Sequence, residues 1–422
     1  MQVQCTGVGN SWKGFGELMK ATGIVVEYNP FHNGHLHHLE QSRVKTDSEV
    51  MIAVMSGNFL QRGEPALVDK WTRTKMALYA GVDLVIELPY AFATAQASDF
   101  AKGAIFLLDA LKCKSFCYGS EEGSLQAFQH TYDLLTVNKS SYNLAISTLM
   151  KEGISYPKAL NEAYKLVSKD VSVPLVDLSK PNNILGYHYI EAAQMLHTQI
   201  QPETIQRVVA NYHDDAKASE TIASATGIRK VLFDDNDLSA IEPFLPATSL
   251  DALNEWQSTA DSFGSWERFY PLLRLIILRH TKESLAQCAE VTEGMENAIW
   301  NAATTCITFQ PFMEKIKSKR FTWTRIQRML THIYTEFTWK QLRETELPTY
   351  IRPLGMNRKG QAYLQSIKKD LQLPLVSRVA ASKKNKLLQL DIKAANLYYL
   401  GLQSSYGQQM VGSDFRIAPI RI

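Results

Sequence analysis

Four almost wholly apolar runs, separated by helical segments, dominate residues 19–121 and restrict what this chain can fold into. The runs are ATGIVVEY (21–28), EVMIAVMSG (49–57), DLVIELP (83–89) and KSFCYGSE (114–121). Helical patterns fill the gaps between them, at 34–46, 69–82 and 95–111. Strands without a polar face, joined by helices, predict a parallel sheet covered on both sides. The sequence therefore predicts a doubly wound α/β domain, whose ligands bind beyond the carboxyl ends of the strands.

A length of 422 residues is too great for one core of typical size and predicts two domains or three. We expect an α/β nucleotidyltransferase-like domain over 19–240, in which TIQRVVANYHDD (204–215) returns to the sheet, and a mainly helical domain over 241–422. Residues 1–18 are polar and lack periodicity, which indicates a disordered or non-native extension.

Charge is distributed unevenly along the chain. Residues 301–422 hold 20 Lys and Arg against 7 Asp and Glu, whereas residues 1–300 hold 25 against 35. A basic module on an acidic body usually has an anionic partner, although solvated lysines on helix surfaces give the same count. Five scattered cysteines do not resemble a disulfide framework, and no apolar run reaches the roughly 20 residues of a membrane span. We expect a cytoplasmic protein without membrane contact.

The stretch VEYNPFHNGH (26–35) follows the first strand and opens the first helix. A helix N-terminus at the carboxyl end of a strand offers unpaired N–H groups and a partial positive charge to a phosphate. Gly34 lets a ligand approach the backbone, and His32 and His35 can enter one pocket. His37 and His38 fall on different faces of the new helix, and each alone is expected at the surface. A zinc site would need further convergent ligands, so we expect no metal at these histidines.

Two more segments have the composition of binding sites. In SATGIRK (224–230), Ser224 and Thr226 can cap a helix whose Arg229 reaches a β- or γ-phosphate, although an N-cap with a surface arginine is the simpler interpretation. In KIKSKRFTWTRIQRMLTHI (315–333), cations surround two aromatic residues, a combination that binds single-stranded RNA. The cations are Lys317, Lys319, Arg320, Arg325 and Arg328. The alternative is an ordinary helix with solvated lysines and a buried Trp323.

These motifs together resemble the tRNA(Met) cytidine acetate ligase family, which carries the HxGH-type signature of the nucleotidyltransferase superfamily. The resemblance runs over nearly the whole chain from Met19 and includes MSGNFLQRGEPA (55–66), YGSEEG (118–123), PNNILGYHY (181–189) and KSKRFTWTRIQRML (317–330). It implies that acetate and ATP, with Mg²⁺, form acetyl-adenylate and pyrophosphate. The acetyl group then passes to N4 of the wobble cytidine 34 of elongator tRNA(Met), with no obligate protein partner.

The resemblance also implies site residues, with His32 and His35 as catalytic contacts to the triphosphate. The family's ATP loop falls on Val25, Val26, Glu27, Tyr28, Asn29, Pro30, Phe31, His32, Asn33, Gly34, His35, Leu36, His37 and His38. Further ATP contacts fall on Gly119, Asn183 (with Asn182 as the alternative), Gln206, Arg207, Ser224, Thr226 and Arg229.

Structural explanations stay open for several of these residues. Gly119 can simply end a strand, Asn182 and Asn183 can cap a helix, and Arg207 can pair with Glu203. Arg73 and Lys75 are ambiguous between pocket and surface. Two other functions compete with the ligase: a small-molecule adenylyltransferase, which does not explain the basic module, and a non-catalytic RNA-binding protein, which does not explain His32, Gly34 and His35.

Overall fold

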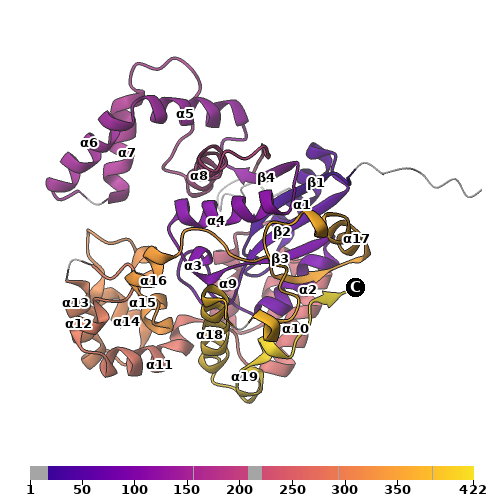
Figure 1. The fold of residues 1–422 in the computed structure, drawn as a ribbon. Coiled ribbons are helices and arrows are strands. Elements are labelled where there is room, and N and C mark those ends of the chain that lie inside the picture. The colour runs from indigo at the N-terminus through magenta and orange to yellow at the C-terminus, as the bar shows by residue number, and fades with distance from the viewer. Residues whose placement is uncertain (1–17, 155, 208–220, 293, 383) are drawn as a thin grey trace, which may run out of the picture.

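The computed structural model describes residues 18–154, 156–207, 221–292, 294–382 and 384–422 (Figure 1). The predicted extension 1–18 therefore lies outside the described residues except for Leu18, and so does the NYHDD motif.

One seven-stranded sheet organises the described chain, in the order β5-β4-β1-β2-β3-β6-β7. The strands β1 to β5 pair in parallel with one another, β6 runs antiparallel to β3, and β7 runs parallel to β6. This confirms the predicted doubly wound α/β fold. The strand bounds are β1 Ala21–Val26, β2 Val50–Ser56, β3 Leu84–Leu88, β4 Ser115–Ser120, β5 Gln201–Gln206, β6 Pro353–Met356 and β7 Ile420–Arg421.

The direction of the strand order reverses between β1 and β4, because the chain moves outward through β2 and β3 and then returns to the other side of β1. Right-handed crossovers place α1 and α2 on one face of the sheet and α4 and α8 on the other, where α4 packs against α8. The bounds are α1 Asn33–Thr46, α2 Lys70–Tyr79, α3 Tyr90–Ala93, α4 Ala97–Ala110 and α8 Pro181–Met195. Such a reversal leaves a crevice at the carboxyl ends of β1 and β4.

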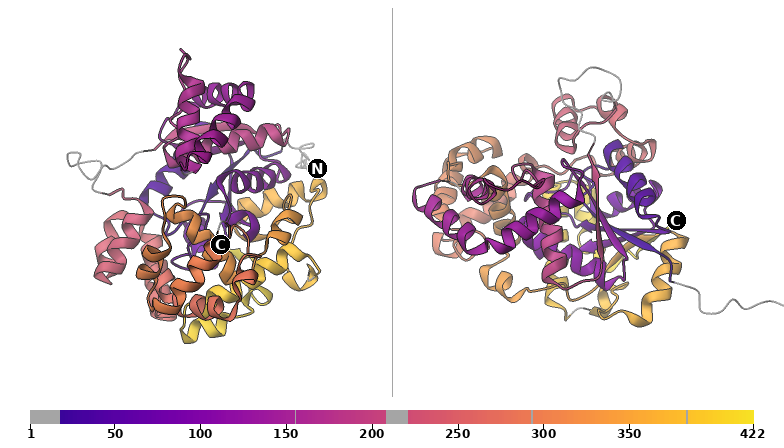
Figure 2. Two further views of the ribbon diagram at one scale, coloured as in Figure 1. Left: turned by 90° about the vertical axis from the view of Figure 1, so that its left-hand side faces the viewer. Right: turned by 90° about the horizontal axis from the view of Figure 1, so that it is seen from above.

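A helical arm interrupts the connection from β4 to α8. It consists of α5 Leu125–Val137, α6 Lys139–Lys151 and α7 Tyr156–Ser168, and it stands away from the C-terminal helices in two views (Figures 1 and 2). The arm has a small core of its own between α6 and α7, which consists of Ile146, Ala159 and Ala163.

The second half of the chain is mainly helical, as predicted, but it also completes the sheet. Its helices are α9 Ala225–Asp235, η1 Leu238–Phe244, α10 Ala247–Ala260, α11 Trp266–Arg279, α12 Lys282–Leu285, α13 Met295–Thr305, α14 Phe309–Ile316, α15 Trp323–Thr335, α16 Trp339–Glu344, α17 Arg358–Ile367, η2 Lys368–Asp370, η3 Val379–Ser382, α18 Lys386–Gly401, α19 Ser405–Met410 and η4 Ser413–Phe415. The strands β6 and β7 were not predicted, and they extend the sheet across the expected boundary at residue 240.

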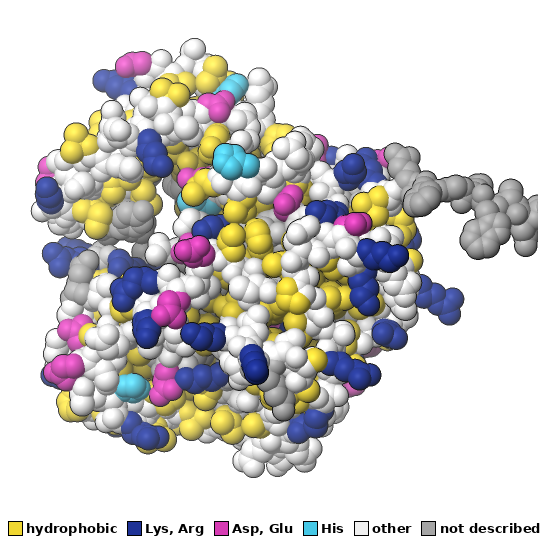
Figure 3. Space-filling model, viewed as in Figure 1, with side chains coloured by type: hydrophobic (Ala, Val, Ile, Leu, Met, Phe, Trp, Pro, Cys, Tyr) yellow, Lys and Arg dark blue, Asp and Glu magenta, His cyan; other side chains and the backbone are white. Residues whose placement is uncertain are grey.

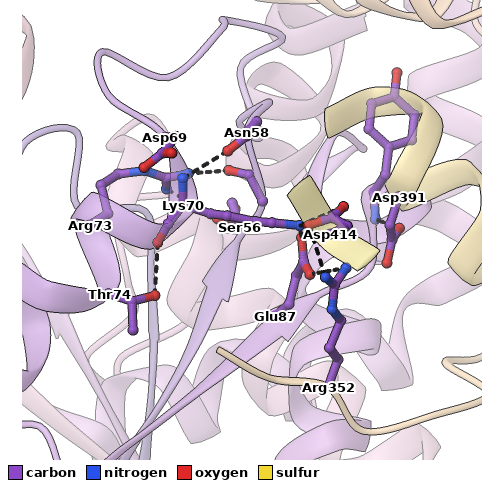
Figure 4. A network of polar contacts seen from close by, with 12 residues as sticks. Ser56, Asn58, Asp69, Lys70, Arg73, Thr74, Glu87, Arg352, Asp391 and Asp414 are labelled. Atoms are coloured by element: carbon purple, nitrogen blue, oxygen red, sulfur yellow. Dashed lines mark hydrogen bonds and ion pairs between the residues drawn. The ribbon is translucent and has the colours of Figure 1, made fainter. Parts of the chain in front are cut away.

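A buried ionic network joins the two halves beside β3 (Figure 4). Lys70 Nζ lies 2.8 Å from Glu87 Oε1 and 2.9 Å from Asp414 Oδ1. The guanidinium of Arg352 lies 2.9 Å from each of the same two carboxylates. All four side chains are at most 4% exposed, and because two cations face two anions, the network is neutral.

None of the helices in the described ranges is long and apolar enough to cross a membrane.

Candidate functional site

His32 and His35 meet at the start of α1. His32 is the N-cap residue, with extended backbone (φ −128°, ψ 172°), and the helix begins at Asn33. The two imidazole rings stack with their centroids 3.7 Å apart, and the backbone N–H of His32 donates to Nδ1 of His35 over 3.3 Å. Nδ1 of His32 and Nε2 of His38 are buried without a hydrogen-bond partner in the described chain. A buried ring nitrogen without a hydrogen-bond partner destabilises the folded protein. Such nitrogens are expected where a bound ligand supplies the missing partner.

A pocket opens beside these rings, at the switch point between β1 and β4. It is lined by His32, Gly34, His35, His37, His38, Gly119, Ile205, Gln206, Arg207, Ile222, Ala223 and Ser224. The structure thus brings together residues up to 192 positions apart that the sequence assigned to one site. The prediction of separate surface positions for His37 and His38 is wrong, because both line the pocket.

The other residues of the predicted ATP loop lie behind the pocket and support it. Tyr28 and Phe31 are buried and pack on each other with ring centroids 4.6 Å apart, and the ring of Tyr28 meets the edge of His35 at 5.0 Å. The amide of Asn33 donates to the carbonyls of Thr221 and Pro243, over 2.9 and 3.1 Å. These two bonds hold the segment before α9 and the helix η1 after it against the start of α1. The remaining residues, which do not line the pocket, are Val25, Val26, Glu27, Asn29, Pro30 and Leu36.

Three histidines of the pocket, His32, His35 and His38, are neutral near pH 7. Burial, with the charge of Arg207 as a second cause, lowers the pKa of His32 to about 3 and that of His38 to about 4. Burial and the neighbouring His32 also lower the pKa of His35 well below 6.5. A neutral imidazole carries one N–H donor, so these rings can hydrogen-bond phosphate oxygens while the arginine supplies the positive charge.

Arg207 reaches the pocket from the end of β5, and its partner is not the predicted Glu203. Its Nη1 lies 3.3 Å from Oδ1 of Asn182, whose amide nitrogen donates to Glu121 over 2.6 Å. Glu203 instead pairs with Lys45 at 3.7 Å. Gly119 lies beside this arginine, because a Cβ built there would stand 3.2 Å from its Cγ.

Asn183 does not line the pocket. Its Oδ1 accepts from the backbone N–H groups of Glu121 and Glu122 over 3.0 and 3.1 Å, and its Nδ2 donates to the carbonyl of Asp177 over 3.1 Å. The side chain is 1% exposed. The amide oxygen therefore fixes the turn after β4, and the amide nitrogen binds the segment before α8. Of the two asparagines, it is Asn182 that contacts a pocket residue.

The segment SATGIRK forms the predicted N-cap, but its arginine does not lie at the surface as the simpler interpretation expects. Ser224 caps α9 by accepting from the N–H of Gly227 over 3.1 Å, and it lines the pocket. Thr226 is exposed and does not line the pocket. Arg229 is not a surface arginine: it donates to the carbonyl of Asn29 over 2.9 Å and to Glu64 over 2.8 Å.

Arg73 supports the site in a way that the sequence left undecided. Its side chain is fully buried and donates to the carbonyls of Glu27, Ser56, Gly57 and Val68. The carbonyls of Glu27, Ser56 and Gly57 lie at the ends of β1 and β2, so one guanidinium satisfies the backbone where two parallel strands finish together. Lys75, in contrast, pairs with Glu255 at the surface.

The basic segment divides into exposed and buried parts. Lys317, Lys319 and Arg320 are exposed between α14 and α15, whereas Arg325 packs over the ring of Phe321 at 4.7 Å. The structure contradicts the expected surface position of Arg328, whose Nε lies 2.9 Å from the buried carboxylate of Glu290. Lys and Arg side chains gather over the C-terminal helices on the face shown in Figure 3. No group of three or more His, Cys, Asp or Glu in the described ranges could hold a metal ion.

Known proteins resemble the chain over almost its whole length. The family model described as HIGH Nucleotidyl Transferase matches residues 19–413. The tRNA(Met) cytidine acetate ligase of Lysinibacillus sphaericus (strain C3-41) is 55% identical over 403 residues, which cover 96% of this chain and 100% of that protein. The enzyme of the same name from Bacillus subtilis (strain 168) is 44% identical over 412 residues, covering 96% and 97%.

Two solved structures share the fold. The apo crystal structure of Thermotoga maritima TmcAL superimposes with a TM-score of 0.88 at 33% identity, covering 96% of this chain and 100% of that one. The same protein bound with alpha-thio ATP gives a TM-score of 0.86 at 32% identity, with the same coverage. On this identity and coverage, the chain belongs to the tRNA(Met) cytidine acetate ligase family of HIGH nucleotidyltransferases.

Proposed function

We propose that this protein joins acetate to ATP and passes the acetyl group to a tRNA. An acetate oxygen attacks the α-phosphorus, the bond to the β-phosphate bridging oxygen breaks, and acetyl-adenylate and pyrophosphate form. N4 of cytidine 34 in elongator tRNA(Met) then attacks the acetyl carbonyl, AMP leaves, and the amine loses a proton. The names of the relatives support this reaction and these partners, tRNA(Met) and acetate.

The observation that carries the proposal is the pocket at the switch point. It combines stacked neutral imidazoles at a helix N-terminus, an arginine in Arg207 and the capped N-terminus of α9 at Ser224. Both half-reactions move negative charge onto phosphate oxygens. Fixed N–H donors and a cation can stabilise this charge in the transition states. We propose that His32 and His35 contact the triphosphate and that Gly119, Gln206 and Arg207 border the nucleotide.

We propose that ATP binds together with Mg²⁺. Magnesium in nucleotide sites usually takes phosphate oxygens together with one or two carboxylates. The residues that line the pocket offer no carboxylate. The protein groups present therefore do not fit a direct site, and no step is assigned to the metal.

The exposed cations between α14 and α15 are proposed to hold the tRNA. Lys317, Lys319 and Arg320 stand at the surface, and the partly exposed Trp323 beside them can stack on an unpaired base. Arg325 flanks them, whereas Arg328 serves the core. A tRNA substrate, together with free thiols at Cys113, Cys117, Cys288 and Cys306, supports a reducing, cytoplasmic setting.

The direct test is incubation with ATP, labelled acetate and total tRNA, followed by nucleoside analysis. The proposal expects label in N4-acetylcytidine and pyrophosphate exchange into ATP that depends on acetate. Exchange that depends instead on a phosphorylated vitamin would support a small-molecule adenylyltransferase. The absence of any exchange, with tRNA still bound, would support a non-catalytic RNA-binding protein.

A further inference from the structure

The hairpin at residues 57–67, which includes most of the motif MSGNFLQRGEPA (55–66), is fixed against the C-terminal helices. Its turn closes through bonds from Leu60 N–H to the Glu64 carbonyl and from Gly63 N–H to the Leu60 carbonyl, each 2.9 Å. The carbonyl of Gly63 accepts from the indole of Trp266 in α11 and from the hydroxyl of Thr331 in α15, both over 2.8 Å. Gly63 has φ +75°, and a Cβ there would stand 2.3 Å from the backbone nitrogen of Arg328, so only glycine fits this approach.

The opposite side of the same hairpin holds the ATP loop. The N–H of Gln61 donates to the carboxylate of Glu27, and the N–H of Leu67 donates to the amide oxygen of Asn29, both over 2.7 Å. Backbone groups on a closed turn make both bonds, so the position of the hairpin is set at both ends. The side chain between these bonds, Glu64, therefore starts from a well-defined backbone.

Glu64 uses this position to hold an arginine of the site. Its Oε2 lies 2.8 Å from Nη2 of Arg229, whose Nη1 donates to the carbonyl of Asn29 over 2.9 Å. The exposed fractions of the two side chains are 26% for the carboxylate and 15% for the guanidinium. We propose that Glu64 is a positioning residue for adenylate formation, because it fixes the guanidinium of Arg229 between the hairpin and the ATP loop. This inference rests on the proposed function.

The arrangement leaves Arg229 able to act on a ligand. A guanidinium has five N–H donors, and the two bonds to Asn29 and Glu64 leave three without an acceptor in the described chain. The bond from Arg229 to the carbonyl of Asn29 places its guanidinium beside the ATP loop, at a residue three positions before His32. A cation held in one orientation stabilises charge that develops in the transition state without reorganising during the reaction.

Removing the carboxylate of Glu64 has two opposite effects on the binding of ATP in the ground state. Without Glu64, the guanidinium is less well oriented, which weakens its contact with the triphosphate. The triphosphate also escapes repulsion by a nearby anion, which strengthens binding. The dissociation constant for ATP should therefore change little, whereas the turnover number, which depends on orientation, should fall.

The test compares four chains: wild type, Glu64→Gln, Arg229→Gln and the double variant. Calorimetric titration with a non-hydrolysable ATP analogue gives the dissociation constant and the fraction of active sites. Acetate-dependent pyrophosphate exchange then gives the turnover number per active site. Glu255→Gln, which breaks the exposed ion pair with Lys75, is the matched control and should behave as wild type.

We expect Glu64→Gln to lower turnover per active site about tenfold, with a dissociation constant within about threefold of wild type. We also expect the double variant to be no slower than Arg229→Gln alone, because both changes remove one function. Unchanged turnover per active site, a weaker ATP affinity as the whole effect, or additive losses in the double variant would each overturn the role of Glu64. A wild-type chain without acetate-dependent exchange would instead refute the proposed function, and the role of Glu64 with it.

Discussion

Replacing His32 by glutamine should remove a measurable part of the acid sensitivity of this fold. Burial lowers the pKa of His32 from 6.5 to about 3. The unfolded chain therefore binds a proton below pH 6.5 that the folded chain binds only below about pH 3. Stability contributed by this neutral group is present above pH 6.5 and is lost as the pH falls, at about 1.4 kcal/mol per pH unit. At pH 5 the loss amounts to about 2 kcal/mol.

Urea denaturation at pH 8 and pH 5 measures this effect directly. The free energy of unfolding of the wild type should fall between the two pH values by about 2 kcal/mol more than that of His32→Gln, since glutamine does not titrate. His197→Asn, at an exposed position, is the control and should follow the wild type. Parallel losses in wild type and His32→Gln would refute the argument that the pocket holds this imidazole neutral by burial.

Other predictions concern affinity, RNA binding and stability. Arg207→Ala should raise the dissociation constant of an ATP analogue by about tenfold or more in calorimetric titration, because a charged hydrogen bond contributes about 1.5–3 kcal/mol. Replacing Lys317 and Lys319 together by alanine should weaken tRNA binding and reduce its salt dependence in a filter-binding series, while acetate-dependent exchange without tRNA stays at the wild-type rate. Arg328→Ala should lower the free energy of unfolding by about 3–5 kcal/mol in urea titrations, because it strands the buried carboxylate of Glu290; a loss of tRNA affinity without destabilisation would contradict its placement in the core.

The sequence predicted β1 to β4 because each of these strands carries its own signal, whereas the polar β5 spans Gln201–Gln206 and begins before the expected segment 204–215. Runs such as 50–56 are apolar at almost every position, which only a strand buried on both faces explains. The strands β6 and β7 lack such a signal, since they contain four and two residues and PLGM begins with proline. Their place is set by tertiary contacts, such as the pairing of Gly355 with Val85.

The candidate site shows a similar division. Gly34, His32 and His35 could be found from a short motif because strand, turn and helix are consecutive in the chain. Arg73 and Arg328 could not be placed, because a buried arginine and a surface arginine look alike until their acceptors are known. In both cases the acceptors, backbone carbonyls and Glu290, come from segments that the fold alone brings near.

The buried ionic network becomes complete only after Asp414 has been synthesised. Lys70, Glu87 and Arg352 have all been synthesised once residue 352 is made, but the second carboxylate of the network, Asp414, follows 62 residues later. Until then the α/β core would enclose an excess positive charge, which costs several kcal/mol. A premature stop before codon 414 should therefore yield a chain that is degraded rather than a smaller working enzyme, although every residue of the ATP pocket would already be present.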